Sequence, residues 1–255
     1  MKLLAALIFF TRLPFWRITE VPAAYFKRVV DYWPFVGWLT GGIMAGTLWP
    51  VSYTHLRAQF LPMSTAVILA LLARLLATGA LHEDGLADFC DGFGGGTSRE
   101  KILSIMKDSH IGTYGVLGLL FYFGLLWNLL STLSLSLACM AVASGDAWSK
   151  FCSAQIINIL PYARKEEESK AKVIYDRMSI STWLPAFIAG GLPMWLFLNR
   201  SYWWAALAPV AVFFLLWQLL RKRLQGYTGD CCGAAFLLCE LSFYLIINLI
   251  YTNLW

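Results

Sequence analysis

The sequence contains seven apolar stretches, and each is close to the roughly 20 residues that a helix needs to cross a lipid bilayer. They are Trp33–Tyr53, Met63–Leu81, Tyr114–Leu130, Leu133–Phe151, Trp183–Leu198, Tyr202–Leu220 and Ala234–Leu249. Hydrophobic residues make up 59% of the 255-residue chain and charged residues only 14%, whereas a soluble domain has roughly 25% charged residues. A water-soluble core cannot cover this much apolar surface. We therefore predict a single polytopic, all-α integral membrane domain over residues 1–255, with about seven transmembrane helices.

The positions of the basic residues predict how these spans are oriented. Most of the 20 Lys and Arg residues lie before the first stretch or in the connections after the second, fourth and sixth, whereas the opposite connections contain only Arg57 and Arg200. Because positive residues concentrate on the cytoplasmic side, we predict a cytoplasmic amino terminus and an external carboxy terminus. Insertion topology and contact with the lipid bilayer then account for the net charge of +5, and we expect no nucleic-acid partner.

The connection between the second and third stretches is unusually acidic. Asp84, Asp88 and Asp91 are spaced at i, i+4 and i+7, so they share one face of a helix that we expect to continue from the second stretch. Carboxylates so placed repel one another unless a cation bridges them, and oxygen ligands select Mg²⁺ or Mn²⁺. With Glu83 they form our predicted Mg²⁺ site. The alternative is an acidic helix end that only faces water.

Phosphate-binding groups follow in the same connection. We expect the glycine-rich run Gly92–Ser98 to interrupt the helix and to offer backbone N–H groups to phosphate oxygens. Arg99 and Lys107 supply cations for phosphate, and Asp108 is a further metal ligand or base. His82, at the other end of the connection, has either a proton-transfer or a packing role. This set suits chemistry on a diphosphate, because metal and cations neutralise its charge in the transition state.

Three ionisable residues fall inside the predicted spans, in their cytoplasmic halves: Arg74, Asp146 and Glu240. Such residues are expensive in a membrane and are often functional. They either form buried ion pairs that fix helix packing, with Asp146 and Lys150 as an obvious i, i+4 pair, or line a cavity open to the cytoplasm.

The acidic motif also carries a family resemblance. The segments His82–Asp88, Asp91-Gly92 and Ile105–Ser109 closely resemble those of cobalamin synthase, the adenosylcobinamide-GDP ribazoletransferase family. Similar signatures are spread over the whole chain: Phe10–Pro14, Pro161–Arg164 and Thr228–Asp230 followed by Glu240.

The resemblance implies a Mg²⁺-dependent transferase of the bacterial cytoplasmic (inner) membrane, with its active site facing the cytoplasm, that acts late in cobalamin biosynthesis. In the implied reaction, a hydroxyl of α-ribazole or α-ribazole phosphate attacks the diphosphate of adenosylcobinamide-GDP and releases GMP. We expect the large corrinoid to lie against the amino-terminal segment and the nucleoside to approach from Asp230. Further partners would be a second copy of the chain or other enzymes of cobalamin synthesis.

We assign roles to residues from their chemistry together with this resemblance. Catalytic roles fall to His82, Lys107 and Asp108. Substrate-binding roles fall to Arg12, Arg99, Ser109, Asp146, Arg164, Asp230 and Glu240. The sequence departs from the family at Leu237, where many relatives have Glu, and at Ser144-Gly145, where we expect Ser-Arg. Lys150 or Arg164 would then supply the missing cation.

Two other functions fit the sequence less well. A CDP-alcohol phosphotransferase has Arg at the position of Asp88, and an aspartate-rich prenyltransferase has two acidic clusters rather than one. A transporter would place its charges at the membrane midplane, in paired broken helices.

Overall fold

The computed structural model describes residues 1–52, 61–164 and 174–253, and in these ranges every regular element is a helix. The first elements are α1 (Lys2–Phe10), the 3-10 helices η1 (Phe15–Arg17) and η2 (Ala23–Tyr32), α2 (Trp33–Ser52), α3 (Met63–Thr78), α4 (Leu81–Gly95) and α5 (Arg99–Lys107). They are followed by α6 (Thr113–Ser131), α7 (Leu135–Ala154), α8 (Ile156–Ile159), α9 (Ile180–Phe197), η4 (Arg200–Ala206), α10 (Leu207–Arg223) and α11 (Gly229–Asn253). The predicted all-α class is confirmed for the described residues.

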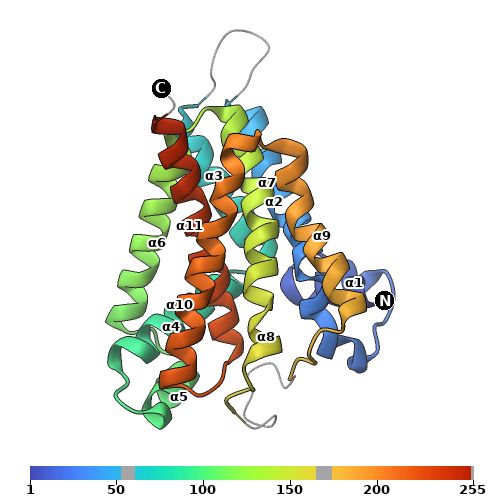
Figure 1. Ribbon diagram of the computed structural model, residues 1–255, viewed down its shortest axis with the longest axis vertical. Helices are drawn as coiled ribbons and strands as arrows, with labels where there is room; N and C mark the ends of the chain where they lie inside the picture. Colours follow the sequence, from blue (N-terminus) through green and yellow to red (C-terminus); the bar gives the residue numbers. More distant parts are fainter. Residues whose placement is uncertain (53–60, 165–173, 254–255) are drawn as a thin grey trace.

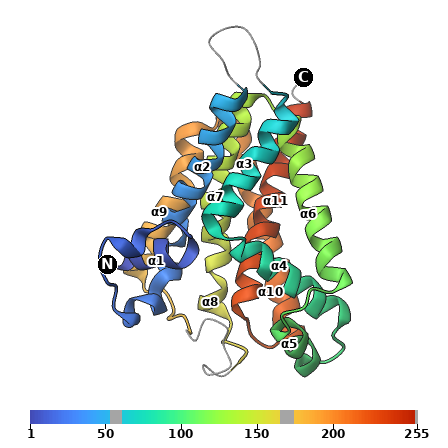
Figure 2. The ribbon, with the colours of Figure 1, turned by 180° about the vertical axis from the view of Figure 1, so that it is seen from behind.

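The long helices run side by side along one axis of the molecule (Figure 1). The end of α2, the start of α3 and the carboxy terminus lie at one end of the bundle, and α5 and α8 lie at the other, as the view from behind also shows (Figure 2). Helix α7 packs against α2, α9 and α11, and α11 also packs against α4 and α10. The core therefore forms around α7 and α11.

The outer helices present apolar side chains to the surroundings of the bundle. Only 28% of the apolar window in α6 and 22% of that in α9 are buried, against 56% in α11. Phe121 on α6 and Leu215 on α10 are more than 60% exposed. Because water disfavours such surfaces and lipid does not, this pattern is that of a membrane protein.

Within the described residues, length and apolar composition mark four segments as able to cross a membrane: α6, α9, η4 with α10, and α11. The pair α3 and α4 passes the same test together as a fifth segment. Helices α2 and α7 also have 20 residues each, but α7 includes Asp146 and Lys150. The bounds of all these helices lie close to the predicted apolar stretches, while the count of seven spans and their orientation stay predictions.

The predicted continuation of the second stretch into the acidic helix is wrong. Helix α3 ends at Thr78, and α4 starts at Leu81 with its axis turned by 92°. The turn is made by two residues in the left-handed region, Gly79 with φ of +66° and Ala80 with φ of +56°. Glycine adopts this conformation without steric cost, so the chain folds back sharply at this position.

The glycine-rich run does not interrupt the helix where we expected. Helix α4 continues through Gly92 and Gly94 and ends at Gly95, with Gly96 as its C-cap in extended conformation. A Cβ atom on Gly94 would lie 2.5 Å from the Tyr114 ring, and one on Gly92 would lie 2.5 Å from Met106. The glycines therefore allow α4 to pack closely against its neighbours, and packing offsets their low helix propensity.

Candidate active site

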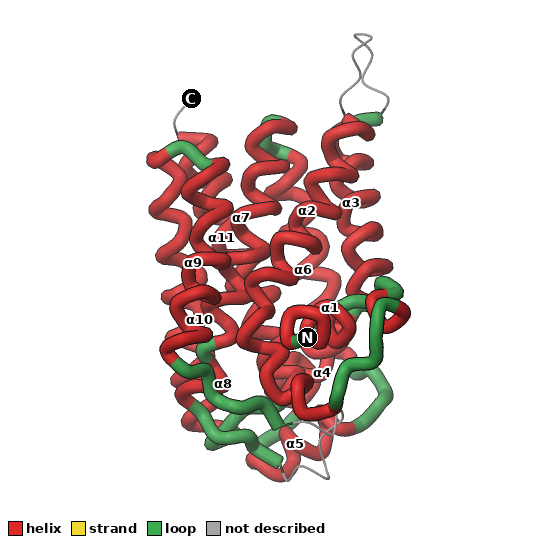
Figure 3. The backbone as a smooth tube through the Cα atoms, turned by 90° about the vertical axis from the view of Figure 1, so that its right-hand side faces the viewer, coloured by secondary structure: helices red, strands yellow, loops and turns green. Residues whose placement is uncertain are grey.

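A cavity of about 120 Å³ lies where α1, η2, α4 and the start of α11 meet. Figure 3 shows α1 end-on in the half of the bundle that contains α4 and α5. Aromatic side chains make up much of the wall: Phe9, Phe10, Trp33, His82, Tyr162 and Tyr175. The rings of Phe10 and Trp33 stack with centroids 5.1 Å apart, and the His82 ring lies 5.4 Å from that of Trp33. The interior of the cavity is therefore largely apolar.

Charged side chains from three segments also line this cavity: Asp84 of α4, Arg164 after α8, and Asp230 of α11. Helices α4 and α11 approach very closely there, because a Cβ atom on Gly85 would lie 3.1 Å from the Cα and carbonyl oxygen of Asp230. Arg164 also donates a hydrogen bond to the carbonyl of Leu103, 2.9 Å away, which ties it to α5. The fold thus brings together two carboxylates and one guanidinium that are far apart in the sequence.

The four predicted metal ligands of α4 do not form one group. Asp84 lines the cavity and Asp88 is half-buried one turn further on. Asp91 is buried, and its carboxylate accepts hydrogen bonds from the backbone N–H groups of Gly112 and Gly115 at 2.7 and 2.8 Å. It therefore caps the start of α6. Among the described residues, no three His, Cys, Asp or Glu side chains are grouped closely enough to hold a metal ion.

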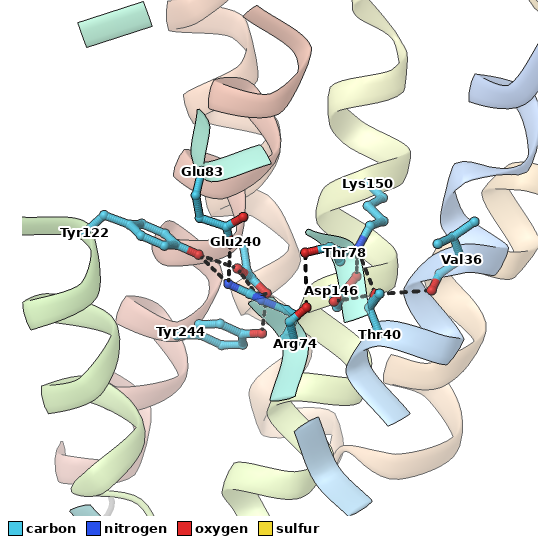
Figure 4. Close-up of polar contacts among 10 residues, drawn as sticks. All are labelled: Val36, Thr40, Arg74, Thr78, Glu83, Tyr122, Asp146, Lys150, Glu240 and Tyr244. Atoms are coloured by element: carbon cyan, nitrogen blue, oxygen red, sulfur yellow. Dashed lines mark hydrogen bonds and ion pairs between the residues drawn. The ribbon is translucent and has the colours of Figure 1, made fainter. Parts of the chain in front are cut away.

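Glu83 points into a buried polar network instead (Figure 4). Arg74 donates to both carboxylate oxygens of Glu240 at 2.7 and 2.8 Å and to the Tyr122 hydroxyl at 2.7 Å. Tyr244 donates to Glu240 at 2.9 Å, and Glu83 lies 3.5 Å from the Arg74 guanidinium. Arg74 and Glu240 are at most 2% exposed. This network connects α3, α4, α6 and α11.

A second buried cluster joins α2 to α7. Lys150 forms the expected ion pair with Asp146, and the Thr40 hydroxyl donates to Asp146 at 2.8 Å. The Lys150 ammonium also lies 4.1 Å from the centre of the Phe236 ring, a cation–π contact. Asp146, Lys150 and Glu240 do not line the cavity, so the structure favours ion pairing over cavity lining for these charges. Of the two candidates for the missing family cation, Arg164 is the one at the cavity.

The remaining predicted site residues lie outside the cavity wall. Arg99 donates to the backbone carbonyls of Leu224 and Ala163 at 2.9 and 2.8 Å, and so connects three segments. Arg12 is exposed, and its side chain lies against Gly79.

The end of α5 is open to solvent. Lys107, Asp108 and Ser109 are exposed there. A hydrogen bond between Asp108 and the His110 ring, 2.7 Å long, lowers the pKa of the Asp108 carboxyl below its usual value. A lower pKa makes Asp108 a weaker proton acceptor.

Sequence reasoning missed the aromatic wall and both tyrosines of the network. Phe10 and Tyr162 belong to motifs already noted in the sequence, and Tyr244 follows Glu240 by one helical turn. These positions in the sequence could have indicated a role at the site. No feature of the sequence indicates such a role for Tyr175, because only folding brings its ring to that of Phe9, with centroids 6.0 Å apart.

The class of protein that these features define is a helical membrane protein, with apolar outer faces and, at one end of the bundle, a cavity lined by aromatic rings and carboxylates. Comparison with known proteins narrows this class. The profile of the family described as cobalamin-5-phosphate synthase matches residues 2–248.

Relatives cover nearly the same length. A protein of Shewanella sp. (strain W3-18-1) is 37% identical over 254 residues, which is 97% of this chain and 93% of the relative. A protein of Leptothrix cholodnii is 38% identical over 255 residues, or 94% of this chain and 92% of the relative. Both are named adenosylcobinamide-GDP ribazoletransferase. No solved structure matches this chain. The chain belongs to the cobalamin-5-phosphate synthase family, and it is a transferase of cobalamin synthesis.

Proposed function

We propose that this chain joins adenosylcobinamide-GDP to α-ribazole or its phosphate at the cavity between α4 and α11. The hydroxyl oxygen of the nucleoside forms a bond to the phosphorus nearer the cobinamide, the bond from that phosphorus to the GMP oxygen breaks, and GMP leaves. The observation that supports this assignment is the meeting of Asp84, Asp230 and Arg164 at one cavity, within the family motifs.

Each of these side chains has a role that its chemistry supports. Arg164 neutralises charge on the diphosphate, since a guanidinium matches phosphate geometry. Asp230 binds the ribose and takes the proton from the attacking hydroxyl. It already lies 3.3 Å from a hydroxyl donor, Thr228. Asp108 does not line the cavity, so we do not give it that role.

Mg²⁺ fits the carboxylates of Asp84 and Asp88. Magnesium in sites that act on phosphates is commonly held by one or two carboxylates, with water and substrate phosphate oxygens completing the shell. Two acids from α4 therefore suffice, although no larger group exists in the described residues. When bound, the ion would stabilise negative charge on the diphosphate.

We further propose that the chain spans the bacterial inner membrane seven times, with this cavity on the cytoplasmic side. Support comes from the fold, because α5, within the acidic connection, and α8, after the fourth stretch, lie at the same end of the bundle (Figure 1). A periplasm-dependent reporter should be active when fused at the carboxy terminus or after Asn199, and inactive at the amino terminus. Activity at both termini would contradict the odd number of spans.

The reaction is tested with purified protein in detergent, given adenosylcobinamide-GDP, α-ribazole and Mg²⁺. GMP and cobalamin should form together and stop when the metal is chelated. Asp84→Asn keeps the side-chain size but removes an anionic ligand, and we expect turnover to fall at least roughly 100-fold, comparable to loss of an electrostatic stabiliser. The matched control is Glu100→Gln at an exposed carboxylate on α5. Equal turnover of Asp84→Asn and the control would refute the assignment of Asp84 to the active site.

A further inference from the structure

The proposed phosphate chemistry uses the carboxylates and Arg164 of the cavity. It gives no role to the aromatic side chains that form the cavity interior. Phe10, Trp33 and His82 contact one another through their rings, and Tyr175 closes onto Phe9 from a segment 165 or more residues away in the sequence. Such walls bind flat rings, because aromatic faces stack favourably on other aromatic faces.

The size of the cavity restricts what it can enclose. An apolar protein cavity of roughly 150 Å³ holds one benzene molecule, and this one has about 120 Å³. A corrin macrocycle cannot enter. One ring of a planar base can, while the rest of a larger substrate stays at the opening, where Leu81 and Asp84 are exposed. The corrin ring therefore has to lie outside this cavity.

His82 indicates that the bound ring has a polar atom. It is 4% exposed, and its Nε2 atom has no hydrogen-bond partner among the described residues. A buried nitrogen without a partner costs free energy, which a ligand atom can recover. Guanine brings several polar edge atoms that would each need a partner, whereas the fused-ring base of α-ribazole has an apolar ring and one free ring nitrogen.

Resting on the proposed function, we infer that the aromatic cavity encloses one ring of the fused-ring base of α-ribazole, with the His82 imidazole paired to the base's free ring nitrogen. The cavity then determines which nucleoside the enzyme accepts, and the corrinoid and GMP parts of the other substrate stay outside it. Phe9, Phe10, Trp33 and Tyr175 form the walls of this subsite.

Blocking the opening tests the location. Leu81→Trp places a larger side chain at a residue that lines the cavity and is 39% exposed, and Leu3→Trp is the matched control on α1, outside the lining and 40% exposed. We expect Leu81→Trp to raise the KM for α-ribazole at least tenfold and to change the KM for adenosylcobinamide-GDP less than twofold. The control should leave both values unchanged. If Leu81→Trp does not fold, Phe9→Leu, which removes one ring of the wall, should give the same selective rise. A rise in the corrinoid KM alone, or no change in either, would overturn the assignment.

A base analogue tests the His82 contact apart from folding. In the analogue, the free ring nitrogen of α-ribazole is replaced by CH. Equilibrium dialysis should show the wild-type enzyme binding α-ribazole roughly 5- to 10-fold more tightly than the analogue, the worth of one hydrogen bond. His82→Phe should bind the two equally, and a persisting preference would refute the pairing. If the wild-type enzyme binds α-ribazole selectively but releases no GMP, the proposed reaction fails while the subsite stands.

Discussion

Removing the Arg74 side chain should destabilise the protein strongly, because it leaves a buried carboxylate without its cation. Glu240 is 0% exposed, and in Arg74→Met its remaining hydrogen-bond donors among the described residues are the hydroxyls of Tyr122 and Tyr244, at 3.0 and 2.9 Å. Breaking a buried ion pair from one side costs about 3–5 kcal/mol. The two remaining donors place the expected loss near the lower figure, about 3 kcal/mol.

A double variant separates the uncompensated charge from lost packing. Adding Glu240→Gln to Arg74→Met removes that charge, so the double variant should be more stable than Arg74→Met alone, with a coupling of about 0.5–3 kcal/mol. Unfolding in mixed micelles with increasing denaturing detergent measures both free energies. Arg200→Met, at an exposed arginine, is the control and should change stability by less than about 1 kcal/mol. If the loss of unfolding free energy in the double variant equalled the sum of the losses in Arg74→Met and Glu240→Gln, the argument would be refuted.

Two further predictions concern α4 and the turn that precedes it. Asp91→Asn should lower the free energy of unfolding by about 1–2 kcal/mol, the usual loss from a damaged helix cap, while turnover per folded molecule stays near normal. A turnover loss as large as that of Asp84→Asn would instead make Asp91 a metal ligand. Gly79→Ala should cost about 1–2 kcal/mol because φ is +66° there, whereas Ala80→Gly, at φ of +56°, should not destabilise. Thermal melting in detergent measures all of these variants.

The sequence predicted the helices well, because roughly 20 apolar residues in a row leave the chain few other structures in a membrane. It also predicted the pairing of Asp146 with Lys150, which are one turn apart on the same helix. It failed at Gly79-Ala80, where two left-handed residues turn the chain by 92°. A Gly-Ala pair inside an apolar run gives no clear signal for such a turn.

The acidic motif could be interpreted only in part, because the sequence does not show which segments pack against it. Spacing at i, i+4 and i+7 correctly placed three Asp residues on one helix, but it gives no information about what faces that helix. Glu83 contacts Arg74, and Asp91 contacts the start of α6. Only Asp84 lies at the cavity, with Asp230 opposite it, a partner that is distant in sequence and meets α4 through the close approach at Gly85.

The buried network and the cavity are connected through consecutive residues of α4. His82 and Asp84 line the cavity, and Glu83, between them, turns to Arg74. Arg74 is in turn held by Glu240 on α11, the helix that carries Asp230 at its start. Arg74 therefore joins the first turn of α4 to α11, the two helices that carry Asp84 and Asp230. On this argument, Arg74 and Glu240, although costly inside the spans, position the helices that carry the cavity carboxylates and do not line the cavity themselves.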